Sequence, residues 1–164
     1  MDQYEIADHI AVELARVYSR ESKEPYFVAV GNHSGYDLVS GSGSVRIELK
    51  TDVVASRSGN AAVEFWDGDR PSGILGTTAN LWVHLIPSDE EEILIAYEFL
   101  VPSLLKLCLE SGRVQKAAGG TTLLKLIPLR LFKLAARRSF RMRTEFFDEI
   151  TAKAGNHAEA PSAG

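Results

Sequence analysis

Cysteines, long apolar runs and a basic leader segment are what this sequence lacks. Cys108 is the only cysteine among 164 residues, which excludes an internal disulfide and a zinc site built from thiolates. No apolar run approaches the roughly 18 residues of a membrane-spanning helix. The acidic first residues lack the basic and apolar regions of a secretory signal. We therefore expect a cytoplasmic protein without membrane segments, in which Cys108 is a buried structural thiol.

The length and composition are those of one globular domain. Hydrophobic residues make up 45% of the chain and charged residues 24%, which is typical of soluble proteins that bury a real core. No internal repeat is visible. We expect a single domain over residues 1–150 and a disordered tail over residues 151–164, where alanine, glycine, proline and serine dominate.

The charge is unevenly distributed along the chain. The formal net charge is −4, yet the segment from residue 113 to residue 143 holds nine basic residues and no acidic one. Such a segment suits a phosphate backbone, although a solvated helix face is an equally simple interpretation. The nine residues are Arg113, Lys116, Lys125, Arg130, Lys133, Arg137, Arg138, Arg141 and Arg143.

Hydrophobic periodicity predicts an α/β fold. Apolar residues recur at helical spacing over residues 3–20, and shorter apolar or alternating runs predict several strands. We expect these elements to form a mixed β-sheet flanked by helices. Strands are predicted over 26–30, 36–40, 44–51, 61–66, 82–86 and 123–129, and further helices over 77–80, 90–111 and 131–150.

The strand predicted around residues 45–50 alternates in polarity. Val45, Ile47 and Leu49 point to one face, and Arg46, Glu48 and Lys50 point to the other. A Gly/Ser-rich turn at residues 40–44 precedes it, so a hairpin would bring Asp37 beside Glu48. Two carboxylates and one lysine on a sheet face are a minimal set for Mg²⁺-assisted phosphodiester hydrolysis, whereas an exposed Glu48–Lys50 ion pair is the simpler interpretation.

This arrangement resembles the PD-(D/E)XK nuclease superfamily, in which an aspartate and a hairpin precede Glu-x-Lys. The chain has Tyr36 where the motif-naming proline would stand. A downstream run is similar to small phage and bacterial DNA nucleases, some of which are similar to Holliday-junction resolvases. That run comprises Gly59-Asn60, Val63-Glu64, Ser72-Gly73, Thr77-Thr78-Ala79 and Trp82.

The resemblance implies a restriction-endonuclease-like core and specific roles for the residues that match. Asp37 and Glu48 would bind Mg²⁺, for which Mn²⁺ can substitute in such enzymes, and the Leu49 backbone carbonyl would be a third ligand. Lys50 would orient the attacking water. Glu13, on the first helix, would add a catalytic carboxylate, with pairing to Arg16 or Arg46 as the alternative.

Other residues receive supporting roles. Glu64 would lie behind the metal ligands, or pair with Lys50 or Arg46. Thr77 and Thr78 would donate to a DNA phosphate, or cap a short helix. Further DNA contacts are assigned to basic residues of the 113–143 segment: Arg130, Lys133, Arg137, Arg138 and Arg141.

We therefore expect a Mg²⁺-dependent DNA endonuclease that acts on branched or duplex DNA, with a structure-selective enzyme favoured over a sequence-specific one. It would serve phage recombination, repair or restriction, and would act as a homodimer through apolar surface from residues 94–109 or 123–135. One alternative is a non-catalytic nucleic-acid-binding protein that retains the fold. Another is a metal-dependent enzyme acting on a small phosphate ester, which leaves the basic segment unexplained.

Overall fold

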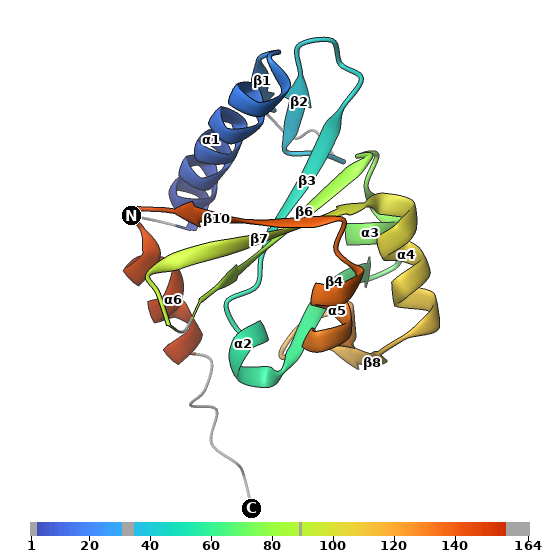
Figure 1. Cartoon of the computed structure of the whole chain (residues 1–164). Helices are drawn as coiled ribbons and strands as arrows, with labels where there is room; N and C mark the ends of the chain where they lie inside the picture. The colour runs from blue at the N-terminus through green and yellow to red at the C-terminus, as the bar shows by residue number, and fades with distance from the viewer. Residues whose placement is uncertain (1–2, 31–34, 89, 157–164) are drawn as a thin grey trace, which may run out of the picture.

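The computed structural model describes residues 3–30, 35–88 and 90–156. Its centre is a six-stranded sheet in the order β1-β2-β3-β6-β7-β10 (Figure 1). Strands β3 and β6 are parallel, and the other neighbours are antiparallel. The fold is therefore α/β with a mixed sheet, as predicted. The strands are β1 Tyr26–Val28, β2 Leu38–Ser40, β3 Arg46–Thr51, β6 Leu81–Pro87, β7 Ile93–Leu100 and β10 Arg138–Arg143.

Helices α1 (Gln3–Ser22) and α6 (Phe147–Asn156) contribute to the core on one face of this sheet. Helix α1 forms because Ile6, Ile10 and Leu14 fall on one side and are buried there. They pack against residues of β3, β6, β7 and β10, including Ile47. The predicted first helix is confirmed, and it lies against the strand that carries the nuclease-like motif.

A second sheet lies over the opposite face, in the order β5-β4-β9-β8. It shares a core with Trp82 and Phe99 of the first sheet and with two helices, α4 (Val101–Glu110) and α5 (Leu129–Ala135). The sequence did not indicate that the strands belong to two separate sheets. The remaining elements are β4 Asn60–Asp67, β5 Arg70–Pro71, β8 Arg113–Lys116, β9 Thr122–Pro128, α2 Ala55–Ser58 and α3 Gly73–Gly76.

The prediction that Cys108 is a buried structural thiol is confirmed. Cys108 is buried in α4, and burial raises the pKa of its thiol to about 11. Trp82 is fully buried in β6, so it is a core residue rather than a platform for bases.

The helix predicted over residues 90–111 is wrong in its first half. Residues 93–100 form β7, which pairs with β6 along one edge and with β10 along the other. Both of its faces are buried, each in one of the two cores. A strand buried on both faces shows no alternation, so its apolar run is indistinguishable from a helix by pattern alone. Pro102 stands in the first turn of α4, where its missing N–H is tolerated, rather than in a break.

The long helix predicted over residues 131–150 is wrong as well. Residues 129–135 are helical, residues 138–143 form β10, and a second helix begins at Phe147. Along β10, Arg141 and Arg143 alternate with Phe140 and Met142. This period of two is typical of a strand, but it is too short to stand out within the basic and apolar stretch that was predicted as one helix. Helix α6 continues to Asn156, so the expected disorder is wrong for residues 151–156, and residues 157–164 lie outside the described residues.

The predicted helix containing Ala79 and Asn80 is absent from the described residues. The helical turn lies earlier, at α3, and Thr77 follows its last residue as the C-cap. None of the helices in residues 3–30, 35–88 and 90–156 has the length and apolar character to cross a bilayer.

Candidate active site

Asp37 is held directly before β2, at the edge of β3. Its backbone N–H donates to the carbonyl of Ile47 at 2.8 Å, and its Oδ2 accepts from the backbone N–H of Leu49 at 2.6 Å. The Asp37 carboxylate thus accepts the backbone hydrogen bond of Leu49 just beyond the point where β2 pairs with β3. The Gly/Ser turn at residues 40–44 returns the chain to this edge, as the sequence predicted.

Glu48 and Lys50 lie on the same face of β3. Ile47 is fully buried against the α1 core, and Val45 and Leu49 pack against the same core, so the alternation places Glu48 and Lys50 on the opposite face. Lys50 Nζ lies 3.3 Å from Glu48 Oε1. The structure therefore brings Asp37, Glu48 and Lys50 together.

The two carboxyl groups are poorly solvated. Burial raises the pKa of Asp37, while the Leu49 N–H and the Lys50 ammonium act in the opposite direction. Burial also raises the pKa of Glu48; Lys50 opposes this, and the charges of Asp37 and Glu64 add to it. Paired carboxylates that are desolvated and mutually repelling are stabilised by a bound cation.

The donor set fits Mg²⁺. Among the described residues, no group of three or more histidine, cysteine, aspartate or glutamate side chains lies close enough together to hold a metal. Mg²⁺ is usually bound by one or two carboxylates together with several waters and substrate oxygens. Asp37 and Glu48 meet that requirement, and a closed cage for Zn²⁺ or Ca²⁺ is not formed there.

Two hollows flank these residues. One, of about 250 Å³, is lined by Asp37 and Lys50 together with Asp8 of α1. The other, of about 230 Å³, is lined by Glu48 together with Arg70 and other residues of the β5–α3 region. The motif is therefore reachable from both sides of the β3 edge.

Glu64 lies close enough to Glu48 for its charge to raise the pKa of that residue. The backbone there is fixed by close packing, because a Cβ on Gly73 would stand 2.2 Å from the Glu64 carbonyl oxygen and Gly73 has a φ of +47°. Glu64 thus has the neighbourhood that was predicted for it.

Glu13 is not brought to Asp37 and Glu48. Burial raises the pKa of Glu13 and has the strongest effect. The residues that also shift this pKa are Thr144, Arg16 and His9, which lower it, and Glu145, which raises it. Its Oε2 is buried without a hydrogen-bond partner, and its side chain lines a separate groove between α1 and β10. The α1 carboxylate that lines the Asp37 hollow is Asp8.

The threonines have a backbone role. Thr77 Oγ1 donates to the Gly35 carbonyl at 2.7 Å, and the Thr78 N–H donates to the same oxygen at 3.0 Å. These bonds attach the segment after α3 to the residues preceding Asp37. Thr77 also lines the hollow beside Glu48, and Thr78 is exposed.

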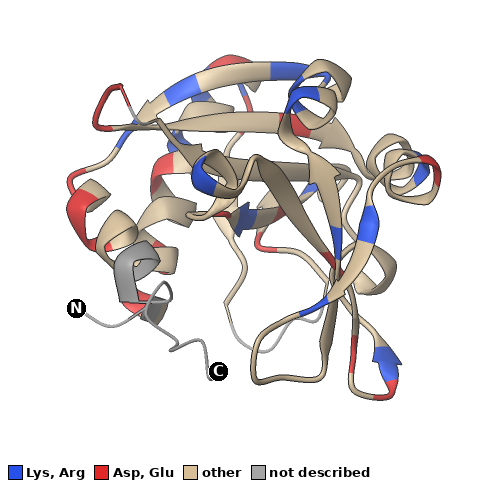
Figure 2. Ribbon diagram, turned by 90° about the horizontal axis from the view of Figure 1, so that it is seen from below, with Lys and Arg blue, Asp and Glu red and all other residues tan. Residues whose placement is uncertain are grey.

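The basic segment is divided among β8, β9, α5 and β10, and over the whole molecule Lys and Arg are spread across helices and strands (Figure 2). Arg137 and Arg138 lie 3.7 Å and 3.0 Å from the buried Glu98 carboxylate, and Arg141 lies 3.0 Å from Glu91. Arg130 and Lys133 are exposed on α5, and no carboxylate of the described residues lies within ion-pair distance of either. The five predicted DNA contacts thus separate into three paired arginines and two available cations.

Arg138 belongs to an internal network. Tyr18 of α1 donates a hydrogen bond to Glu98, whose Oε2 also accepts from Arg138 Nε at 3.0 Å. The same guanidinium contacts Glu21 at 2.7 Å and lies 5.3 Å from the Tyr18 ring centre. Arg138 therefore joins α1 to β7 and β10.

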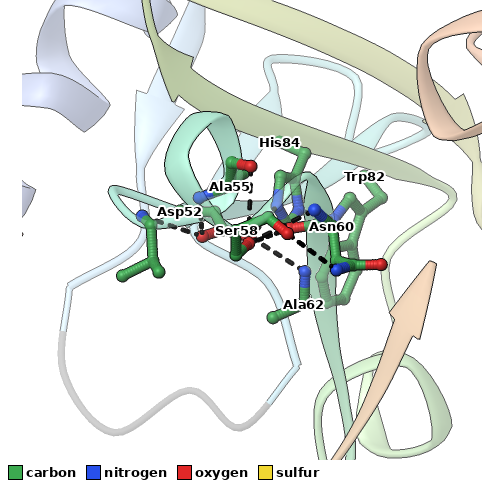
Figure 3. A network of polar contacts seen from close by, with 8 residues as sticks. Asp52, Ala55, Ser58, Asn60, Ala62, Trp82 and His84 are labelled. Atoms are coloured by element: carbon green, nitrogen blue, oxygen red, sulfur yellow. Dashed lines mark hydrogen bonds and ion pairs between the residues drawn. The ribbon is translucent and has the colours of Figure 1, made fainter. Parts of the chain in front are cut away.

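A second polar network, which the sequence patterns did not reveal, secures the end of β3 (Figure 3). Asp52 accepts from the backbone N–H groups of Ala55 at 3.0 Å and Ala62 at 2.8 Å. The Trp82 indole donates to His84 Nδ1 at 3.2 Å, and His84 Nε2 lies 3.3 Å from Asp52 Oδ2. Since an indole N–H can only donate, Nε2 carries the imidazole proton and donates to Asp52.

Asp52 stands two residues after Lys50, so this network ties the motif strand to α2, β4 and β6. Burial acts to raise the pKa of Asp52, but the hydrogen bonds from His84, Ala62 and Val54 outweigh it and lower that pKa. The sequence signal was an aspartate directly after a predicted strand and before a short turn, which is typical of capping residues.

Comparisons with known proteins identify no family. No family model matches the chain, and no curated protein matches it. Among solved structures, it is similar to the bacterial homing endonuclease I-Ssp6803I, at 17% identity and a TM-score of 0.45, over 97% of this chain and 100% of that one. A likeness at this level assigns no function, so the function is inferred from the residues themselves.

Proposed function

We propose that the chain is a Mg²⁺-dependent DNA endonuclease. The observation that supports this most strongly is the arrangement of Asp37, Glu48 and Lys50 at one point of the β3 edge. Two desolvated carboxylates and an ammonium at 3.3 Å from one of them are suited to phosphodiester hydrolysis, in which charge on the phosphate must be neutralised and water activated.

Each residue has a defined task in this proposal. Asp37, fixed by the Leu49 N–H, and Glu48 would hold the ion, with the Leu49 carbonyl as the third protein ligand. Bound Mg²⁺ would supply Lewis-acid polarisation of the phosphate and a lowered pKa for bound water. Lys50 would hold the attacking water and offset charge on the scissile phosphate, and Glu64 would maintain the negative field around Glu48.

The substrate would approach across the two hollows beside the motif. Of the five predicted DNA contacts, exposed Arg130 and Lys133 are best able to contact a phosphate backbone, because Arg137, Arg138 and Arg141 already face carboxylates. We propose selectivity for branched structures, as in resolvase-like enzymes, and an intracellular prokaryotic or phage setting.

A homodimer is part of the same proposal, since two symmetric cuts require two sites. Of the two segments expected to supply apolar surface, residues 93–99 are mostly buried in the core. Leu109 and Leu134 are 74% and 73% exposed on α4 and α5. The α4–α5 side is therefore the proposed dimer surface.

The test is cleavage of labelled four-way junction, flap and linear duplex DNA with Mg²⁺ or Mn²⁺. Lys50→Ala should lower the rate by roughly 10²–10³-fold, the range for loss of one electrostatic contact to the transition state. Lys106→Ala removes an equivalent charge from the surface of α4, where Lys106 pairs with Glu110, and should leave the rate unchanged.

The alternative is a nucleic-acid-binding protein that keeps the fold without cleavage. The observation in its favour is that, within the described part of the chain, only two carboxylates rather than three meet at the motif. Folded wild-type protein that binds DNA in a salt-dependent way, cuts none of the substrates and is unaffected by Glu48→Ala would establish this alternative and refute the endonuclease.

A further inference from the structure

A further groove lies apart from the two hollows of the motif, between the two ends of the six-stranded sheet. Strands β1 and β10 stand at opposite ends of the strand order, and α1 lies between them (Figure 1). The groove has a volume of about 840 Å³ and is lined by residues of all three elements. Neither the motif nor the basic segment as a whole accounts for it.

The charged residues in the lining of the groove are predominantly cationic. Arg16 and Arg20 come from α1, and Arg141 and Arg143 come from β10. All four are exposed, and Arg141 also lies 3.0 Å from Glu91. Glu13 is the acidic residue in the lining, so guanidinium groups outnumber carboxylates by four to one. A groove of this kind attracts a chain of phosphates.

An aromatic ring accompanies these charges. Phe27 on β1 lines the groove and is 55% exposed, which is unusual for a phenylalanine in a strand of three residues. Sites for single-stranded nucleic acid combine a cationic groove with aromatic side chains on which bases stack. Phe27 with the four arginines reproduces that combination.

At Val28 the groove borders the hollow of the candidate active site that contains Asp37 and Lys50. Ala29 directly follows β1 and stands two residues after Phe27, roughly 7 Å along an extended chain. The Ala29 N–H donates to the Asp37 carbonyl at 2.8 Å. Val28 lines both this groove and the hollow that contains Asp37 and Lys50. A strand of nucleic acid lying on Phe27 would therefore lead directly to Asp37.

We infer that this groove binds a single-stranded segment of nucleic acid, with phosphates on Arg16, Arg20, Arg141 and Arg143 and a base on Phe27. Its volume is that of a site for a small molecule, which accommodates a few nucleotides of one strand but not a duplex. The inference rests on the proposed function in one respect: the single-stranded segment in the groove is taken to be the unpaired arm of the DNA that is cut at Asp37 and Glu48.

The experiment measures binding and cleavage separately. Binding of a fluorescent 12-nucleotide oligothymidylate is followed by anisotropy in EDTA, where cutting is prevented, across a series of salt concentrations. The variants are Arg16→Gln with Arg20→Gln, and Phe27→Ala. The matched controls are Lys106→Gln with Arg113→Gln, which remove equal charge elsewhere, and Val114→Ala, which shortens an exposed apolar side chain on β8.

The double arginine variant should weaken binding about tenfold and reduce the salt slope by about 1.4, the value for two lost phosphate contacts on a single strand. Phe27→Ala should weaken it at least about fivefold. The controls should bind like wild type, and Arg16→Lys with Arg20→Lys should restore most of the salt slope. On DNA, the groove variants should slow cutting of a flap more than cutting of a linear duplex.

Groove variants that bind the oligonucleotide as well as the controls do would overturn the inference, whether or not the protein cuts DNA. Competition by polyglutamate as effective as that by unlabelled oligonucleotide would also overturn it, since the groove would then accept any acidic chain. Groove-dependent binding without cleavage of any substrate would support the single-strand site and refute the endonuclease, so the two proposals fail by different results.

Discussion

At the scale of single residues, the behaviour of the site is governed by burial of charge. Glu48 is placed where its ionised form is desolvated and repelled by Asp37 and Glu64, and only Lys50 offsets this. Such a residue opposes folding at neutral pH and becomes favourable when a cation arrives. Functional sites commonly hold charged groups that stability alone would remove.

The first prediction concerns Glu48→Gln. Without divalent metal at pH 7, the variant should have the melting temperature of wild type or one a few degrees higher, because the amide carries no buried charge. Adding Mg²⁺ should raise the melting temperature of wild type but not that of the variant, since a ligand stabilises only the state that binds it. Thermal unfolding measures both.

Glu110→Gln, at an exposed position on α4, is the matched control and should keep the Mg²⁺ effect. A variant that melts well below wild type, or that still gains stability from Mg²⁺, would contradict the assignment of Glu48 as a metal ligand.

The second prediction concerns pH. The pKa values of Asp37 and Glu48 are raised, so both carboxyls hold their protons at a pH where ordinary carboxyls are ionised. Metal binding requires the ionised forms. Mg²⁺ affinity should therefore fall, as pH is lowered, before the usual carboxyl range is reached. Lys50→Met should move this fall to still higher pH, because Lys50 lowers both pKa values.

Titration calorimetry of Mg²⁺ binding across roughly pH 5–8, which lies above the pKa of ordinary carboxyl groups, measures this fall in affinity. Lys106→Met is the control for loss of a lysine. An unchanged pH profile in Lys50→Met would show that Lys50 does not act on the metal-binding carboxylates.

At the scale of elements, β3 is positioned by a polar network just beyond its last residue. Asp52 receives hydrogen bonds from the start of α2, from β4 and from His84 of β6. These partners come from positions up to 32 residues away in the sequence. Loss of the Asp52 carboxylate would leave several buried donors without an acceptor, and such donors are costly.

The third prediction is that Asp52→Ala destabilises the protein by about 2–4 kcal/mol at pH 7. The pKa of Asp52 is lowered in the folded protein, so its contribution is present above the unfolded pKa and is lost as pH falls through the folded value. The difference between wild type and variant should therefore shrink in acid. Urea unfolding at pH 7 and near pH 3 measures it.

Asp69→Ala, in the exposed turn before β5, should change stability little and serves as the control. A loss that is equal at both pH values would mean that packing around Asp52, rather than its charge, stabilises the end of β3.

At the scale of the whole molecule, some cations of the basic segment pair with carboxylates and others are exposed to solvent. Arg137 and Arg138 lie beside the buried Glu98, and Arg141 lies beside the exposed Glu91, so part of the basic segment is paired with carboxylates. Arg130 and Lys133 remain exposed on α5. The net charge of −4 therefore conceals local surfaces that can still attract DNA.

The fourth prediction uses this separation of charges. Replacing both Arg130 and Lys133 with Gln should weaken duplex DNA binding and reduce the salt slope by about 1.8, the value for two phosphate contacts on B-DNA. Arg141→Gln with Arg143→Gln should change duplex binding less, because Arg141 already faces Glu91. Binding isotherms over a salt series in EDTA measure both.

Lys106→Gln with Arg113→Gln is the control for equal loss of charge. Equal effects of all three double variants would show that duplex DNA responds to net charge rather than to the α5 surface.

Patterns among residues close together in the sequence were sufficient to predict α1, β3 and the turn that joins Asp37 to β3. The helical spacing of Ile6, Ile10 and Leu14 determined α1, and the alternation through Val45, Ile47 and Leu49 determined β3 and the side on which Glu48 and Lys50 lie. The Gly/Ser turn after Asp37 determined the return of the chain to β3. These features depend on neighbours a few residues apart, and side-chain period reports such neighbours directly.

Only the tertiary structure decided what depends on distant partners. It made residues 93–100 a strand that pairs with β6 and β10 and is buried on one face by the α1 core and on the other by the core of the second sheet, and it divided the strands into two sheets. It placed Glu13 in the cationic groove rather than beside Asp37, since the direction of α1 relative to β3 is set by packing of the core. It also brought Arg137, Arg138 and Arg141 close to carboxylates far away in the sequence, because the energy of an ion pair depends on distance in space and on burial, which sequence spacing does not encode.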